Sequence, residues 1–255
     1  MSTVKARRRT LLRGIALITI ARAAAAEAGV RVACANGFRP AMTGIAGEFS
    51  GVVEVDYAEG AVLAQRLAGG AKVDVVILPR SILDPLALQG IVVPQSVADL
   101  AATDVLGIAV RSGAAKPKAE TAEAFRRWLL GLKSIALTDP ALAGGASRQF
   151  QSTIEQLGIA EEMKRKVVLT QGGSANTGLV TSGKAEAAVQ LSHLLRAVDG
   201  LALVAVPPEF RGTVSFAAGM VAGTPDRAAA ETLIDFLKGP VAARAIEASG
   251  MRRMS

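Results

Sequence analysis

Short runs of β-branched residues alternate along this chain with stretches in which apolar residues recur at helical spacing. Met42, Ile45 and Phe49, for example, stand at positions i, i+3 and i+7, which places one apolar face on a helix. Helices with such a face are predicted over residues 42–49, 150–157, 226–237 and 240–248. These stretches are separated by apolar runs too short to form helices of their own.

The apolar runs predict the strands. They cover Val30–Ala35, Val52–Tyr57, Val73–Leu78, Val105–Val110, Ser134–Thr138, Lys166–Thr170, Glu186–Leu191, Leu201–Val206 and Val214–Val221. Strands that alternate with helices are typical of an α/β protein, and we expect its sheets to be largely parallel. We find no repeat and no low-complexity linker, so any domain boundary lies inside ordered segments.

Four of the predicted strands end in small or polar residues, and a helix follows each of them. The turns are Asn36-Gly37, Glu59-Gly60, Gly144-Gly145 with Ser147, and Gly172-Gly173-Ser174. Ligands of open α/β sheets bind beyond the carboxyl ends of the strands, where helix starts offer unpaired N–H groups and partial positive charge. One such turn is explained by helix capping alone. Four that converge predict a site for a small anion.

The first 26 residues have the three parts of an export signal. Arg7-Arg8-Arg9 opens the segment, an apolar run follows, and Ala23–Ala26 closes it before Glu27. The paired arginines also resemble a twin-arginine signal. The apolar run is shorter than the ~20 residues that a membrane anchor needs. We therefore expect residues 1–26 to direct export to the bacterial periplasm.

The basic character of the chain belongs to this leader. The net charge is +7, and residues 1–26 contribute six cations and no acid, which leaves +1 for the remainder. A general nucleic-acid-binding surface is therefore not expected. The single cysteine, Cys34, excludes an internal disulfide and reads as a buried small hydrophobe. The chain also has a single histidine, His193, so we expect no metal site built from cysteine and histidine ligands.

Several segments resemble the molybdate-binding proteins of bacterial ABC importers and, more broadly, the type II periplasmic solute-binding fold. They are Gly60–Leu67, Val73–Ile77, Thr138-Asp139-Pro140, Gly183–Ala187 and Phe236–Ala243, and the resemblance covers residues 28–252. It implies two α/β lobes with a ligand cleft between them, joined by two crossover strands, Val105–Val110 and Val214–Val221. Lobe 1 would comprise residues 27–106 and 216–255, and lobe 2 residues 107–215.

The same resemblance assigns positions to the ligand site. The two serines that hold the oxoanion in that family fall at Asn36 and Gly60, and the family's tyrosine falls at His193. The backbone contacts fall near Gly145 and Ala175. Asn36 can donate from its amide, but Gly60 can donate only from its backbone. The cleft is thus expected, whereas specificity for molybdate is not.

Each candidate side chain could also serve the fold rather than the ligand site. Glu59 is either a first-turn charge or a catalytic base, and Arg148, after Ser147, is either solvent-facing or a carboxylate ligand. The polar groups Ser174, Asn176 and Thr177 suit an oxyanion or a helix cap. His193 is either structural or a proton-transfer group. The predicted ligand-binding set is Asn36, Gly37, Gly60, Gly145, Ser147, Arg148, Ser174, Ala175, Gln190 and His193.

Three functions fit these observations. The first is a periplasmic solute-binding protein, a monomer without cofactor, that captures a molybdate-like oxoanion or an organic carboxylate for an ABC permease of the inner membrane. The second is an enzyme on the same cleft, similar to aconitate isomerase, that interconverts trans- and cis-aconitate by a proton shift through His193 or Glu59. The third is a ligand sensor or partner-binding domain. The scarcity of aromatic residues, 4%, disfavours a sugar ligand.

Overall fold

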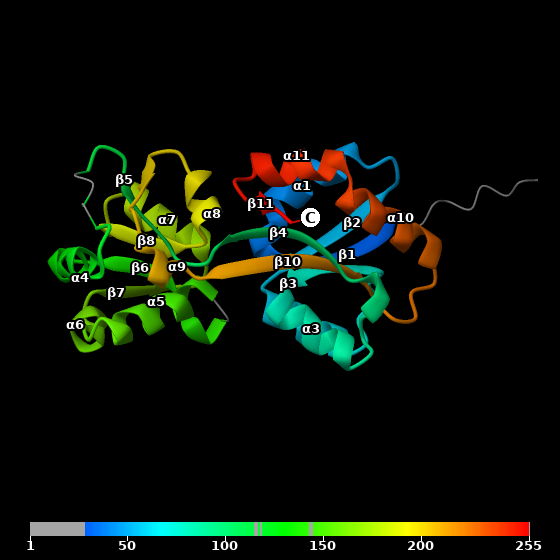
Figure 1. Ribbon diagram of the computed structural model, residues 1–255, viewed down its shortest axis with the longest axis horizontal. Helices are drawn as coiled ribbons and strands as arrows, with labels where there is room; N and C mark the ends of the chain where they lie inside the picture. The colour runs from blue at the N-terminus through cyan, green and yellow to red at the C-terminus, as the bar shows by residue number, and fades with distance from the viewer. Residues whose placement is uncertain (1–28, 115–116, 118, 143–144, 255) are drawn as a thin grey trace, which may run out of the picture.

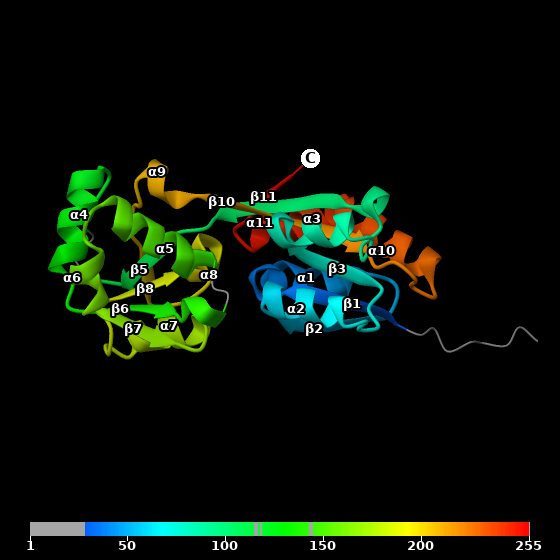
Figure 2. The ribbon, with the colours of Figure 1, turned by 90° about the horizontal axis from the view of Figure 1, so that it is seen from below.

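The computed structural model describes residues 29–114, 117, 119–142 and 145–254. The predicted export leader, residues 1–26, lies outside these residues. The described chain forms two lobes that lie side by side along the long axis of the molecule (Figures 1 and 2), each built on one sheet. No helix in the described part of the chain is long and apolar enough to cross a membrane.

The first lobe is built on a six-stranded sheet. Its strands in spatial order are β11 (Arg252–Arg253), β4 (Ala98–Asp104), β10 (Thr213–Met220), β3 (Val75–Pro79), β1 (Val30–Ala35) and β2 (Val53–Ala58). Helices α2 (Gly60–Ala68) and α3 (Arg80–Leu88) cover one face, and α1 (Arg39–Glu48), α10 (Arg227–Lys238) and α11 (Pro240–Ala248) cover the other (Figure 1). Short 3-10 turns, η1 (Asn36–Phe38) and η2 (Pro94–Ser96), complete the lobe.

The second lobe is built on a five-stranded sheet. Its strands in spatial order are β7 (Val167–Thr170), β6 (Ile135–Thr138), β8 (Ala187–Gln190), β5 (Gly107–Arg111) and β9 (Leu201–Leu203). Its helices are α4 (Ala122–Gly131), α5 (Gly145–Gln156), α6 (Ala160–Lys164), α7 (Gly173–Thr181), α8 (Ser192–Arg196) and α9 (Pro208–Arg211), with the 3-10 turn η3 (Pro140–Leu142).

Side-chain size alternates along the central strands of the second sheet. Ile135 and Leu137 point into the core beneath α4, α5 and α6, whereas Ala136 joins a smaller cluster beneath α7 and α8. Successive strand residues face opposite sides of a sheet, so the large residues build one core layer and the alanines let the other helices approach closely.

The chain passes between the lobes twice, and the two passages are neighbours. Val105 and Leu106 lead from β4 to β5, and the chain returns at Gly212 before β10. The Val105 N–H donates to the Gly212 carbonyl at 3.2 Å, and the Leu106 N–H donates to the Arg211 carbonyl at 2.8 Å. The lobes are therefore joined by two hydrogen-bonded segments, an arrangement typical of a hinge.

Most predicted elements are confirmed, including all nine strands and the α/β class, but three expectations need correction. The sheets are mixed rather than largely parallel, because β10, β4, β5 and β9 run against their neighbours. Strand β4 was not predicted, since its sequence of alanines and aspartates lacks a β-branched run. The two predicted crossover strands each lie mainly within one sheet, β5 and β10, and the crossing residues are those just before them.

The predicted lobe boundaries at 106/107 and 215/216 stay a prediction. The first boundary falls inside the passage formed by Val105 and Leu106. The second boundary falls inside β10, which pairs with β4 of the first lobe from Thr213 onward.

A buried ion pair ties the strand starts of the first lobe together. Asp74 accepts from the backbone N–H of Arg31 at 2.9 Å and from its guanidinium at 2.8 and 3.0 Å, and the Thr224 hydroxyl donates to the same carboxylate at 2.7 Å. The guanidinium is the main cause that lowers the pKa of Asp74 to about 2. The Asp74 side chain is only 7% exposed.

We predict that Asp74→Asn lowers the free energy of unfolding by about 2 kcal/mol at pH 7, because charged hydrogen bonds of a buried group are lost. The folded-state pKa is depressed, so the contribution of Asp74 is complete above pH 4 and is lost as the pH falls toward 2. Urea unfolding at pH 7 and pH 3 measures both effects. As a control, Asp235→Asn removes an ion pair whose carboxylate is 72% exposed and should change stability little. Equal effects of the two substitutions would contradict the prediction.

Candidate functional site

A cavity of about 280 Å³ lies between the two lobes, and residues of both lobes line it. We call it the inner cavity. All four glycine-bearing turns meet there. The predicted site residues that line it are Asn36, Gly37, Glu59, Gly60, Gly145, Arg148 and Gln190. The structure thus brings together turns that are far apart in the sequence.

Backbone N–H groups at helix starts face this space. Helix α2 begins at Gly60 after Glu59, and α7 begins at Gly173 after Gly172; neither preceding residue makes a side-chain capping bond among the described residues. The first amides of such helices lack partners within the helix, and the helix dipole gives them partial positive charge. Two helices from opposite lobes therefore offer donors to one bound anion.

The first lobe also contributes a carboxylate. The Asn36 amide donates to Glu59 Oε1 at 3.0 Å, and the Arg39 guanidinium donates to Asn36 Oδ1 at 3.1 Å. The Arg39 guanidinium lies over the Tyr57 ring, 4.4 Å from its centroid. These contacts connect the starts of α1 and α2 and hold Glu59 toward the cavity. Asn36, expected as a ligand donor, has one amide hydrogen committed to Glu59 and one remaining.

Arg148 provides the positive charge of the second lobe. It lies in the first turn of α5, is exposed, and lines the inner cavity. It forms no ion pair with any residue that the structure describes. A guanidinium with free donors suits a carboxylate, which it can hold through two parallel hydrogen bonds.

Neighbouring side chains pack closely against three glycines at the cleft, so a Cβ at any of them would require the neighbour to shift. A Cβ at Gly60 would lie 2.7 Å from Ile82, one at Gly37 would lie 2.8 Å from Phe216, and one at Gly173 would lie 1.6 Å from Gln190 Nε2. A serine hydroxyl at position 60, which the molybdate-binding family has, would therefore need Ile82 to shift. The Gln190 side chain fills the space over Gly173.

His193 does not line the inner cavity, which corrects the prediction that it binds ligand or acts as a base. It is 1% exposed, and both ring nitrogens have partners in the first lobe. Nε2 lies 2.8 Å from the Gly37 carbonyl, and Nδ1 lies 3.1 Å from the Thr103 hydroxyl. A carbonyl only accepts, so Nε2 carries the proton and Nδ1 of the neutral ring accepts. Burial lowers the pKa of His193, in keeping with a neutral ring. His193 thus fastens α8 to the first lobe.

The remaining predicted residues divide into structural and cleft positions. Ser147 is buried within α5, away from the lining. Asn176 is fully buried, donates to Thr138 Oγ1 and the Val189 carbonyl, and accepts from the Thr170 hydroxyl, so it ties strand ends together. The Thr177 hydroxyl donates to carbonyls of its own helix.

Ser174 and Ala175 line a second cavity of about 570 Å³, which we call the outer cavity. It adjoins the inner cavity, because both are lined by Asn36, Glu59, Gly173, Gln190 and Leu194. Arg39 lines the outer cavity and was missed in the sequence. Its position three residues after Asn36, at the start of the next helix, is the signal that could have identified it.

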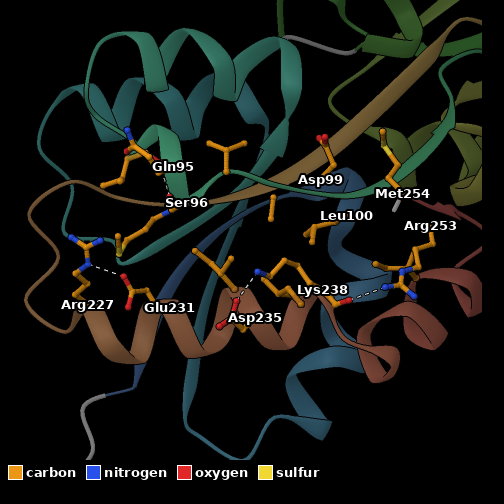
Figure 3. A pocket seen from close by; sticks show the side chains of 17 residues that line it. Gln95, Ser96, Asp99, Leu100, Arg227, Glu231, Asp235, Lys238, Arg253 and Met254 are labelled. Atoms are coloured by element: carbon orange, nitrogen blue, oxygen red, sulfur yellow. Dashed lines mark hydrogen bonds and ion pairs between the residues drawn. The ribbon is translucent and has the colours of Figure 1, made fainter.

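A separate cavity of about 540 Å³ on the first lobe lies between β4 and α10 (Figure 3). Four of its charged side chains form two ion pairs. Arg227 pairs with Glu231 at 2.7 Å, and Lys238 pairs with Asp235 at 2.6 Å. Arg253, which also lines this cavity, donates to the Lys238 carbonyl at 2.8 Å. The described residues also contain no cluster of three or more His, Cys, Asp or Glu side chains able to hold a metal ion.

Comparison with known proteins agrees with this geometry. Residues 30–252 match the family described as bacterial extracellular solute-binding protein. An aconitate isomerase from Pseudomonas sp. is 30% identical over 191 residues, which are 74% of this chain and 71% of that protein.

Two solved structures show the same fold. The substrate-binding domain of a putative molybdenum ABC transporter from Clostridium difficile has a TM-score of 0.68 at 18% identity, covering 89% of this chain and 99% of that one. The periplasmic molybdate-binding protein of Azotobacter vinelandii has a TM-score of 0.68 at 19% identity, covering 89% of this chain and 100% of that one. The predicted two-lobed type II fold is confirmed.

We predict that stability falls between pH 7.5 and pH 5.5 because of His193. The unfolded ring takes up a proton near its ordinary pKa of 6.5, whereas the folded ring, with its lowered pKa, stays neutral, so acid favours unfolding. His193→Gln should flatten this dependence and lower the free energy of unfolding by about 1–3 kcal/mol at pH 7.5. Thermal melts across the range measure both effects. A variant with the same pH profile as the wild type would contradict the assignment.

Proposed function

This chain belongs to the family of bacterial extracellular solute-binding proteins, and from that premise we propose that it captures an organic carboxylate in the periplasm for an ABC permease. The observation that carries the proposal is the meeting of Arg148 with the uncapped helix starts of both lobes at one cavity. Closure of the lobes around the bound anion would present the loaded form to the permease.

The lining favours a carboxylate over a tetrahedral oxoanion. The positions that correspond to the two serines of the molybdate-binding family hold Asn36 and Gly60, so both hydroxyl donors are missing. Glu59 adds a negative charge to the lining, so a ligand that spreads its charges over a carbon skeleton can keep them away from Glu59, whereas a compact oxoanion cannot. Ile82, Leu191 and Phe216 supply an apolar wall that suits a carbon skeleton.

The cleft needs no cofactor for this role. Binding requires only that the closed form interacts more strongly with the ligand than the open form does. Neutral donors, helix dipoles and one or two arginines supply that interaction without a metal.

We predict that Arg148→Ala weakens binding of trans-aconitate or citrate ten- to a hundredfold, because a charged hydrogen-bonded contact worth about 1.5–3 kcal/mol is lost. Isothermal titration of purified protein with these acids and with molybdate and sulfate measures the effect. Arg165→Ala is the matched control, since Arg165 is also an exposed arginine of the second lobe but lies outside both cavities. Preferential binding of molybdate, unaffected by Arg148→Ala, would overturn the proposal.

A second candidate function is isomerisation of aconitate, and Glu59 is the observation that favours it. A carboxylate at a cavity that binds carboxylic acids is well placed as a proton-transfer group, and the 30% identity with an aconitate isomerase adds support. Asn36 holds one oxygen of Glu59, which leaves the other for the substrate.

In that reaction Glu59 would remove a proton from the methylene carbon of trans-aconitate. The electron pair of the broken C–H bond forms the new double bond, and the old double bond opens toward its far carbon. That carbon then receives a proton from Glu59, which gives cis-aconitate with no net change in atoms or charge. Arg148 and the helix starts would hold the carboxylates and stabilise the charge that spreads onto them. His193 takes no part, because both of its ring nitrogens are engaged.

If the protein is an isomerase, we predict that Glu59→Gln lowers turnover of trans-aconitate at least a hundredfold while affinity stays within a few fold, since general-base catalysis contributes about 10²–10⁴. Vinyl proton signals in NMR spectra follow the conversion. Glu48→Gln, which changes an exposed acid outside both cavities, should match the wild type. Saturable binding by the wild type with no conversion would exclude isomerisation and leave transport.

A further inference from the structure

We propose that Arg39 holds a second carboxylate of the ligand, so that the protein selects anions with a negative group at each end. This inference rests on the proposed function, which places a carboxylate at Arg148. It concerns the length and charge of the ligand, which that function leaves open.

The first support is the continuity of the two cavities. Five residues line both the inner and the outer cavity, so the two spaces adjoin at these residues. Together they are larger than a single small anion requires. A ligand bound at Arg148 that extends past Glu59 would reach the outer cavity.

The second support is the distribution of charge along this cleft. Arg148 lines only the inner cavity, Arg39 lines only the outer cavity, and Glu59 lines both. Two cationic ends are thus separated by one carboxylate. A ligand with one negative group at each end and an uncharged carbon chain between them matches this order, because it keeps its own charges away from Glu59.

The third support is that Arg39 is fixed in place before any ligand binds. The Tyr57 ring and Asn36 Oδ1 hold its guanidinium, and it forms no ion pair with an acidic residue in the described ranges. Asn36 uses one donor of the guanidinium, and the others remain for a ligand. A preorganised guanidinium loses little conformational freedom when it binds a carboxylate.

The opposite wall of the outer cavity supplies matching donors. Ser174 is exposed in the first turn of α7 and lines the same cavity as Arg39. Arg39 comes from the first lobe and Ser174 from the second, so a carboxylate between them would also favour closure of the cleft.

Glutarate and valerate test the proposal as probes, since both are unbranched five-carbon acids and only glutarate carries a carboxylate at each end. Ligand-observed NMR titrations give the affinities for wild type, Arg39→Gln, Arg39→Lys and the control Arg165→Gln. We expect wild type to bind glutarate at least a hundredfold more tightly than valerate. Arg39→Gln should weaken glutarate ten- to a hundredfold and leave valerate within twofold, and Arg39→Lys should restore part of the loss.

The outcomes separate this inference from the proposed function. Equal affinity of wild type for the two acids, or an equal loss of affinity for both in Arg39→Gln, would show that Arg39 does not bind a second carboxylate. The proposed function would still stand in that case, because the chain binds carboxylates. Failure of wild type to bind either acid would overturn the proposed function as well. The melting temperature of each ligand-free variant shows whether the loss of the Tyr57 contact has disturbed the fold. If it has, Arg39→Lys, which keeps the positive charge, decides: failure of this variant to restore any affinity would overturn the inference.

Discussion

The chain passes between its two lobes twice, and the two passages are hydrogen-bonded to each other through Val105 with Gly212 and Leu106 with Arg211. Because the passages are adjacent, the lobes are held at one side and face each other across a gap. The carboxyl ends of the parallel strands in both sheets point into that gap. Everything proposed for this protein depends on this geometry, since neither lobe alone surrounds the cleft.

The contact around Gly37 adds a second connection between the lobes. His193 donates to the Gly37 carbonyl, and Leu191 packs where a Cβ at Gly37 would lie 3.0 Å away. The turn Asn36-Gly37 is therefore held at Gly37 by residues of the second lobe. The sequence suggested that His193 is a ligand in the cleft, but its side chain instead holds the backbone of Gly37 beside the cleft. Burial favours its neutral form and lowers its pKa, although the hydrogen bond to the Gly37 carbonyl acts in the opposite direction.

Charge within the cleft is sparse and separated, although the described chain has many surface ion pairs. Glu59 faces the space between Arg148 and Arg39, and neutral amide donors complete the lining. A few unpaired charges in a largely apolar cleft interact strongly with a ligand, because water is displaced when the lobes close.

The sequence by itself determined the class of fold and the turns that line the cleft. Short apolar runs predicted nine strands, and all nine are present in the structure. The glycines after four of them marked helix starts that meet at the inner cavity. These features are local, since strand and helix preferences and the chain turns that follow the strands are properties of short segments. Only the tertiary structure decided the rest. Strand direction, the alanine-rich β4 and the roles of His193 and Asn176 depend on partners up to 156 residues away in the chain, and no local pattern records which side chain those partners will meet.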